Sequence, residues 1–182
     1  MSPITLRPAR KSDATTIVSL LELADTALLD IVIGLADRDA ARHELIARVQ
    51  QDDYFASYRF ARLAEHDGEI VGLIVAYPGE LETTFSSDSI VRESTDDAYH
   101  IESISTVPAW RGRGVGTLLL DTIATLAITC GCTRLSLLVD PANTGACRLY
   151  QRLGFIAADR VSYDQYHYQR LFRPLTPAAN RC

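Results

Sequence analysis

The sequence predicts an α/β fold in which a mixed central sheet of about seven strands is flanked by about four helices. The main reason is that apolar runs of strand length alternate along the chain with longer segments whose apolar residues recur at helical spacing. A second reason is size, because 182 residues with 47% hydrophobic content can bury one core but not two comfortable ones. We therefore expect one domain over residues 1–173 and a C-terminal tail over residues 174–182.

The predicted elements follow the order β-α-α-β-β-β-α-β-α-β-β. Strands are expected at residues 4–8, 58–64, 70–77, 99–106, 135–139, 156–161 and 166–172. Helices are expected at residues 13–31, 37–49, 115–130 and 144–153. The Asp67-Gly68 pair favours a tight hairpin between the second and third strands. Residues 78–97 are polar and turn-rich, so they should be the least structured segment.

Composition excludes several classes of protein. A net charge of −5 and a pI near 5.3 give the chain no attraction for nucleic acid or for an anionic membrane. No run approaches the ~18 apolar residues of a membrane span, and residues 1–11 lack the apolar core of a signal peptide. The cysteines have no metal-like spacing with the histidines, so we expect no metal, buried reduced thiols and a cytoplasmic location. They are Cys130, Cys132, Cys147 and Cys182.

A glycine-rich turn separates the predicted strand at 99–106 from the predicted helix at 115–130. Residues 107–116 read V-P-A-W-R-G-R-G-V-G. Glycine allows the chain to turn sharply and lets a ligand approach the backbone amides. The first N–H groups of the helix have no partner within it, and the helix dipole favours an anion there. With Arg111 and Arg113 beside it, this turn is predicted to bind a pyrophosphate.

The spacing of the glycines limits the choice of nucleotide. A dinucleotide fingerprint requires G-x-G-x-x-G and a P-loop requires Lys after its last glycine, and the turn has neither. What remains is R-x-x-G-x-G preceded by Pro and an aromatic residue. With its flanks, this segment resembles the pyrophosphate-binding motif of the GNAT superfamily of acetyl-CoA-dependent N-acetyltransferases. Thr106 stands where Val is usual, a mild change because both residues are β-branched.

A second segment carries the same resemblance independently. Residues 143–155 read N-T-G-A-C-R-L-Y-Q-R-L-G-F and match every fixed position of the family pattern N-x-x-A-x-x-L-Y-x-x-x-G-F. Asn143 is expected to cap this helix and Gly154 to end it. The resemblance covers roughly residues 57–172. It implies a GNAT domain that transfers acetyl directly from acetyl-CoA to a primary amine of a small molecule or a protein N-terminus.

The resemblance also implies which residues hold the cofactor. The backbone of the glycine turn would bind the pyrophosphate, and the end of the preceding strand would pair with the amide-bearing pantetheine arm much as a peptide adds to a sheet edge. Asn143 is the usual side-chain helper in the family. The expected cofactor-binding residues are Ile104, Ser105, Thr106, Arg111, Gly112, Arg113, Gly114, Val115, Gly116 and Asn143.

Three residues are candidates for catalysis. Tyr150 matches the family's general acid, which protonates the departing thiolate, and we favour this role over the alternative of a core tyrosine on the apolar stripe. His100 and Glu102 are two residues apart on one strand, so they point to the same face and either could deprotonate the acceptor ammonium. We favour Glu102 as the base, with His100 relaying through a water. A structural role for either side chain remains the alternative.

The acceptor is the least determined part of the prediction. The family builds the acceptor pocket from regions that correspond here to residues 24–53, 79–97 and 159–167. The middle region is acidic and could attract a cationic amine, or it could be a solvated loop. Aromatic residues that could line the pocket are Tyr54, Phe55, Tyr77, Tyr163, Tyr166 and Tyr168. A homodimer is an open option, and a catalytically weak CoA-binding sensor or assembly module is the alternative to an enzyme.

Overall fold

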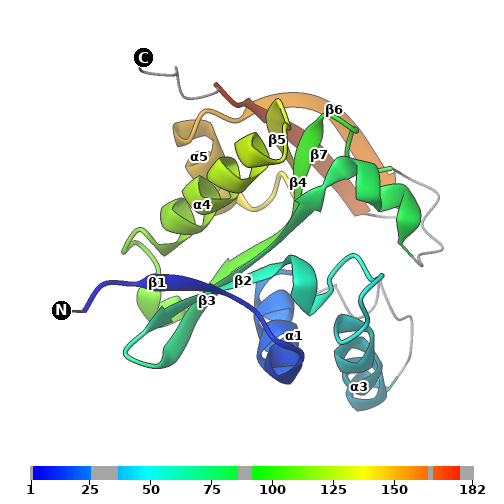
Figure 1. Cartoon of the computed structure of the whole chain (residues 1–182). Helices are drawn as coiled ribbons and strands as arrows, with labels where there is room; N and C mark the ends of the chain where they lie inside the picture. The colour runs from blue at the N-terminus through cyan, green and yellow to red at the C-terminus, as the bar shows by residue number, and fades with distance from the viewer. Residues whose placement is uncertain (1, 26–36, 86–91, 164–165, 177–182) are drawn as a thin grey trace. The chain divides into compact units, whose positions relative to one another are not determined.

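The computed structural model describes residues 2–25, 37–85, 92–163 and 166–176 (Figure 1). Contacts divide the chain into two compact units. The first comprises Met1–Ala76, Phe85–Ser87 and Glu102–Leu120, and the second comprises Tyr77–Thr84, Asp88–Ile101 and Asp121–Cys182. The strands are hydrogen-bonded in the order β1-β2-β3-β4-β5-β7-β6. These seven strands, with parallel and antiparallel pairs, confirm the predicted α/β fold class.

The first unit is built on antiparallel strands. These strands are β1 (Thr5–Pro8), β2 (Ala61–His66) and the greater part of β3 (Glu69–Pro78). Asp67 and Gly68 both have positive φ, 49° and 83°, as the predicted hairpin requires. The helices of this unit are α1 (Ala14–Ala24) and α3 (Arg38–Val49). Their apolar faces supply Ile17 and Leu45, each with no exposed surface, to a common core with Leu63 of β2.

The second unit contains the other strands. They are β5 (Arg134–Val139), β6 (Ile156–Tyr163) and β7 (Tyr166–Pro174). This unit also contains helix α5 (Thr144–Arg152) and the short 3₁₀ helix η3 (Gly79–Thr84). Strand β5 pairs antiparallel with β7 and parallel with β4 (Ala98–Thr106). Strand β4 gives residues 98–101 to the second unit and 102–106 to the first. Helix α4 (Val115–Thr129) also continues from one unit into the other.

Most predicted helix ends are confirmed by their hydrogen bonds. Asp37 caps α3 by accepting from the amides of Asp39 and Ala40. Helix α4 ends at Thr129, and it is followed by Gly131, whose φ is +80°, with amides 131 and 132 bonded to the carbonyls of residues 128 and 127. The predicted first helix is described only as far as Ala24, so the expected stripe residues Leu28 and Ile31 lie outside the described residues. Among the described helices, none is long and apolar enough to cross a membrane.

Two expectations about local structure are wrong. Residues 58–60 form a 3₁₀ turn rather than strand, because the Ser57 hydroxyl accepts from the Arg59 amide and turns the chain before β2. In the segment at 78–97, predicted to be the least structured, the described residues between β3 and β4 form the short 3₁₀ helix η3 and a bonded stretch described below. The thiols are not buried, since Cys130 is exposed and Cys132 and Cys147 are half-buried, while Cys182 lies outside the described residues.

Candidate active site

The glycine-rich turn lies between β4 and α4, within the first unit. Gly112 and Gly114 have φ of +73° and +84°, a conformation that L side chains rarely adopt. A Cβ at either position would meet nothing within 4 Å, so backbone conformation and not crowding requires glycine there. The Gly114 carbonyl accepts the Leu118 amide at 3.0 Å, which starts the helix ladder. The amides of Val115, Gly116 and the next residue therefore precede the ladder and can bind an anion.

Two arginines flank this turn, and both side chains have local contacts. The Arg111 Nε donates to the Thr106 carbonyl at 3.3 Å, which ties the turn to the end of β4. The Arg113 guanidinium lies 4.9 Å from the centre of the Trp110 ring, a cation–π distance. The imidazole ring of His66 also lies near Trp110, with 4.5 Å between the two ring centroids. Arg111 and Arg113 are exposed, so their charges remain accessible to a phosphate.

The end of β4 contains the residues predicted to pair with pantetheine. Ile104 and Thr106 are half-buried, while Ser105 is 7% exposed and its hydroxyl has no hydrogen-bond partner among the described residues. Gly72 of β3 makes this arrangement possible. A Cβ on Gly72 would lie 3.0 Å from the Ser105 carbonyl oxygen and 2.9 Å from a Val115 methyl group. Sequence reasoning did not identify Gly72, because nothing local distinguishes it from other glycines in strands.

Glu102 lines a pocket within the first unit. The lining residues come from α1, its C-terminal cap, α3, the segment after α3, and β4. They are Leu21, Asp25, Leu45, Tyr54, Phe55, Ala56, Glu102 and Ser103. Tyr54 and Phe55 were among the aromatic residues expected near the acceptor. Asp25 and Leu45 fall within one of the three expected regions, but no motif pointed to them individually.

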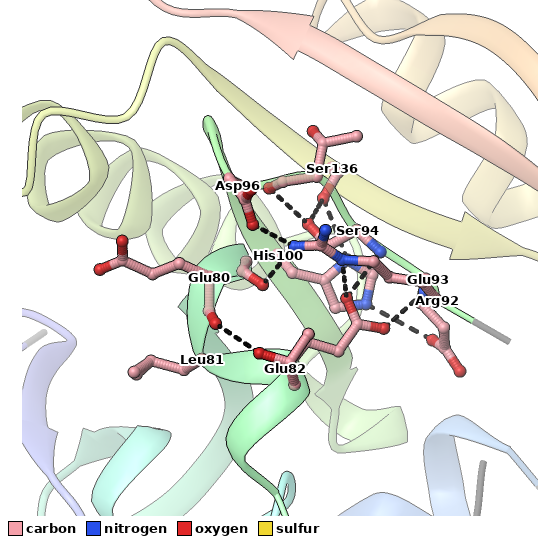
Figure 2. A network of polar contacts seen from close by, with 12 residues as sticks. Glu80, Leu81, Glu82, Arg92, Glu93, Ser94, Asp96, His100 and Ser136 are labelled. Atoms are coloured by element: carbon pink, nitrogen blue, oxygen red, sulfur yellow. Dashed lines mark hydrogen bonds and ion pairs between the residues drawn. The ribbon is translucent and has the colours of Figure 1, made fainter. Parts of the chain in front are cut away.

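His100 occupies a different environment, inside the second unit. It is 1% exposed, and its Nδ1 lies 3.0 Å from the Ser136 hydroxyl, which in turn lies 3.0 Å from the Ser94 hydroxyl. Its Nε2 lies 3.5 Å from a Glu93 carboxylate oxygen. The Tyr77 ring is 5.5 Å from the imidazole. Figure 2 shows this buried polar network around His100. The imidazole is therefore buried inside this network, with Ser136 on its Nδ1 side and Glu93 on its Nε2 side.

The acidic segment beside this network is bonded to itself. Glu82 accepts from the backbone amides of Glu93 and Ser94, the second at 2.9 Å. Arg92 lies 3.7 Å from Glu82 and donates to the Gly79 carbonyl at 3.2 Å (Figure 2). Glu82 thus joins η3 to the residues that lead into β4. The Glu82 carboxylate therefore binds this segment of the chain itself, whereas the sequence suggested that the acidic residues here could attract a cationic amine.

Tyr150 and Asn143 belong to α5 in the second unit. The Tyr150 ring is 6% exposed and packs 5.4 Å from the Phe155 ring. Burial raises the pKa of the Tyr150 phenol, so the hydroxyl stays protonated at neutral pH and can donate a proton. The Asn143 side-chain oxygen accepts from the Ala146 amide at 3.1 Å, which confirms the predicted cap. Its amide nitrogen is the side-chain group left for a cofactor.

The predicted site residues thus divide between the two units. Glu102 and the cofactor residues from 104 to 116 belong to the first unit. His100, Asn143 and Tyr150 belong to the second. Within its own unit, Glu102 lines a pocket with aromatic and apolar walls, whereas His100 is enclosed by side chains that it contacts directly. The two candidates for the base therefore differ in burial, His100 being 1% exposed and Glu102 half-buried.

A strand that ends in a glycine turn before a helix, followed by a strand and an Asn-capped helix, is an α/β arrangement that can bind a phosphate-bearing cofactor. The model of the acetyltransferase (GNAT) family matches residues 26–155, and the chain belongs to this family of acyltransferases. The family resemblance predicted from the two motifs is confirmed. Members of the family use acetyl-CoA as the co-substrate and act on amine-bearing acceptors.

Two characterised relatives are similar over different lengths. N-alpha-acetyltransferase MAK3 of Arabidopsis thaliana is 33% identical over 106 residues, which cover 58% of this chain and 47% of that protein. The chain therefore spans about half the length of this relative. Thialysine N-epsilon-acetyltransferase of Mus musculus is 27% identical over 155 residues, which cover 85% of each chain.

Solved structures share the fold. The N-acetyltransferase from Staphylococcus aureus Mu50 has a TM-score of 0.75 and 26% identity, over 92% of this chain and 99% of that one. N-acetylglutamate synthase from Neisseria gonorrhoeae, complexed with coenzyme A and N-acetyl-glutamate, has a TM-score of 0.59 and 18% identity. That comparison covers 97% of this chain and 36% of the synthase.

Proposed function

We propose that this protein is an N-acetyltransferase that transfers the acetyl group of acetyl-CoA directly to a primary amine. The observation that carries the proposal is the turn at residues 111–114, where Gly112 and Gly114 adopt positive φ immediately before α4. A turn of this geometry presents backbone amides to a pyrophosphate. In a member of the GNAT family, the pyrophosphate is that of coenzyme A.

The cofactor would be held mainly by the backbone. The amides of residues 112–116 would bind the pyrophosphate, with Arg111 and Arg113 adding charge on either side. The polar groups of residues 104–106 would bond the two amides of pantetheine. The amide nitrogen of Asn143 would donate to the same arm, because its oxygen already caps α5.

The chemistry requires one base and one acid. Glu102 would take a proton from the acceptor ammonium, and the neutral nitrogen would then attack the thioester carbonyl carbon. As the carbon–sulfur bond breaks, the Tyr150 phenol would give its proton to the sulfur, and the proton that the nitrogen loses in becoming an amide would restore the phenol. The products are an N-acetyl amine and CoA with a free thiol. Burial raises the pKa of the Tyr150 phenol, so at neutral pH the hydroxyl still carries the proton that the departing sulfur needs.

The structural contrast described above guides the assignment of the base. Glu102 is half-buried and lines a pocket, whereas His100 is enclosed by Ser136, Glu93 and Tyr77. A base must reach the proton that it removes, directly or through one water. We therefore propose Glu102 as the base and give His100 the task of holding the strand that carries it. The acceptor would be a small amine or the N-terminus of a protein.

The experiment that tests this function compares two glycines at the two ends of α4. Gly114 and Gly131 have φ of +84° and +80°, and a Cβ at either would meet nothing within 4 Å. Valine at each position should therefore cost a similar stability, about 1–3 kcal/mol. Gly114→Val should in addition weaken CoA binding by about 10- to 100-fold through lost amide contacts, and Gly131→Val should not.

Calorimetric titration with CoA measures both variants, and release of the free thiol from acetyl-CoA is measured with a panel of primary amines. Equal CoA affinity in the two variants would contradict the assignment of the turn. Tight CoA binding with no thiol release above background for any amine would contradict the transferase and identify a CoA-binding module.

A further inference from the structure

The hairpin between β2 and β3 supports the glycine-rich turn within the first unit. The amide of Val107, at the start of the turn, donates to the Val71 carbonyl of β3 at 3.0 Å. The imidazole of His66, the last residue of β2, has its centroid 4.5 Å from that of the Trp110 ring. One contact holds the backbone of the turn, and the other holds its aromatic side chain. The position of Trp110 therefore depends on the hairpin as well as on the turn.

The His66 side chain is itself held in place. It is only 13% exposed, and its Nε2 lies 3.3 Å from a carboxylate oxygen of Asp67, the next residue of the hairpin. A ring that is mostly buried and lies against a neighbouring carboxylate has little room to move aside. His66 thus gives Trp110 a fixed surface to pack against.

Trp110 in turn contacts a cation of the turn. The Arg113 guanidinium carbon lies 4.9 Å from the centre of the Trp110 ring, and Arg113 is exposed. An arginine packed on an aromatic ring keeps N–H donors along the edge of its planar group, and these match the oxygens of a phosphate. The contact therefore limits the motion of the side chain without using the donors that a phosphate needs.

A cation that is held in place binds an anion more tightly than one that moves freely. An arginine side chain has many rotamers in solution, and it loses them when it binds a phosphate. When the side chain already rests on an indole ring, part of that loss has occurred before the ligand arrives. An exposed cation–π contact corresponds to about a twofold to fivefold change in an equilibrium constant, which sets the size of the effect expected from Trp110.

We propose that Trp110 is a positioning residue, which holds the Arg113 guanidinium ready for a phosphate of CoA, and that His66 holds Trp110. This inference rests on the proposed function, because it requires CoA to bind at the turn. CoA offers two groups of the right chemistry, the pyrophosphate and the 3′-phosphate of its ribose. The guanidinium would donate N–H bonds to the oxygens of one of them.

Substitutions at Trp110 test the ring directly by calorimetric titration. Trp110→Leu removes the aromatic face and should raise the Kd for CoA about fivefold, whereas Trp110→Phe keeps such a face and should recover most of this loss. Phe172→Leu is the matched control, because the Arg134 guanidinium lies over the Phe172 ring at the same 4.9 Å but in the second unit. It removes an equivalent contact and should leave the Kd for CoA unchanged.

A double-mutant cycle shows whether Trp110 acts through Arg113. Arg113→Met should raise the Kd about tenfold in the wild-type background, near the value of a charge-assisted hydrogen bond, and only about twofold in Trp110→Leu. His66→Leu should raise the Kd about twofold and have no further effect in Trp110→Leu. An equal factor for Arg113→Met in both backgrounds would overturn the inference. If Trp110→Leu folds poorly, the cycle between His66→Leu and Arg113→Met replaces it, and full additivity is then the contradicting result.

Trp110 also reports on the turn spectroscopically, because it is the only tryptophan in the chain. Its emission should change as CoA is added, with the Kd that calorimetry gives. An emission spectrum that saturating CoA leaves unchanged would overturn the inference. Calorimetry with 3′-dephospho-CoA, which keeps the pyrophosphate, identifies the phosphate: an equal loss for both ligands in Trp110→Leu assigns the pyrophosphate, and a loss for CoA alone assigns the 3′-phosphate.

The outcomes separate this inference from the proposed function. If the wild type does not bind CoA, both are overturned. If the wild type binds CoA tightly and Trp110→Leu leaves the Kd unchanged, only the inference is overturned. If the expected losses of CoA affinity are found in a protein that acetylates no amine, the proposed transferase is overturned and the role of Trp110 stands.

Discussion

The two halves of β4 differ in their surroundings although they form one continuous strand. Residues 98–101 are all buried and pair with β5. Residues 102–104 are half-buried and lead to the glycine turn within the other unit. His100 in the first half is enclosed by a polar network, while Glu102 in the second half lines a pocket. The first half fixes the strand, and the second half exposes the groups that can do chemistry.

This contrast leads us to expect that one half of β4 contributes mainly to stability and the other mainly to activity. His100 and Glu102 are both titratable and lie on the same face of the strand, so residue type and spacing do not distinguish them. What distinguishes them is burial, because His100 is 1% exposed and Glu102 is half-buried. We therefore expect substitutions in the first half to change the free energy of unfolding, and substitutions in the second half to change the rate of acetyl transfer.

The largest expected effect is that of Glu102→Gln on acetyl transfer. This variant keeps the shape of the side chain but deletes its basicity, so kcat/KM should fall by about 10³-fold at low pH, within the usual range for a general base. The loss should shrink at high pH, where solvent has already deprotonated the amine. His100→Gln should change kcat/KM by about tenfold or less. Profiles of kcat/KM against pH would show the contrast, and a larger loss in His100→Gln would reverse our assignment.

Removal of the proposed acid should have the next largest effect. Tyr150→Phe deletes one hydroxyl and should lower kcat by about 10²-fold with little change in KM for acetyl-CoA. Tyr99→Phe is the matched control, because Tyr99 is a buried phenol in the first half of β4. Its kcat should stay within about twofold of wild type. Steady-state kinetics under conditions where chemistry limits turnover would measure both, and an unchanged kcat in Tyr150→Phe would return that tyrosine to a packing role.

The order of the two β4 positions should reverse when stability is measured. His100→Ala removes one of the two partners of the Ser136 hydroxyl and leaves a cavity inside a buried network, which should cost about 2–3 kcal/mol. Glu102→Ala removes a half-buried side chain and should change the free energy of unfolding by about 0.5 kcal/mol or less. Urea unfolding would measure both. Equal losses would mean that the two halves of β4 contribute alike to stability.

The smallest effect concerns the anchor at the start of β4. Burial opposes ionisation of Asp97, but hydrogen bonds from Arg134, Thr95 and Thr133 outweigh it and lower its pKa to about 2. A depressed folded-state pKa stabilises the protein above the unfolded value near 4, and this stability is lost as the pH falls from about 4 to about 2.

The Asp97 side chain is 41% exposed, so solvent screening should limit the contribution to about 1 kcal/mol or less. Unfolding measured between pH 6 and pH 2 should show an acid-dependent loss that is smaller in Asp97→Asn. If stability depends on pH identically in the wild type and in Asp97→Asn, then Asp97 does not cause the acid-dependent loss.

The parts of the fold that the sequence predicts correctly are those decided by local chemistry. Asn143 caps α5 because its short side chain reaches an amide three residues away. Gly112 and Gly114 turn the chain because only glycine takes their φ without strain. The Asp67-Gly68 hairpin follows the same logic. In each case the interaction spans only a few residues, so the pattern alone contains the cause.

The features that sequence reasoning missed depend on distant partners. His100 meets Ser136, 36 residues away, and no spacing rule connects them. The segment at 78–97 has a polar composition that suggests a loose loop, yet Glu82 bonds the backbone of Ser94 twelve residues later. Burial and pairing of polar groups are tertiary properties, and they decide which candidate residues are available for chemistry.

The contact of Gly72 with α4 has a consequence for how this sequence can diverge. Because a Cβ at position 72 would meet a Val115 methyl group at 2.9 Å, the two positions share one fixed volume. The Ser105 carbonyl oxygen would also lie 3.0 Å from that Cβ, and because it belongs to the backbone, no substitution can remove it. A larger residue at 72 can therefore persist only with a smaller one at 115 and a displaced strand. A homologue without this glycine would therefore need two substitutions together. It would also have a shifted amide at position 115, at the end of the glycine-rich turn.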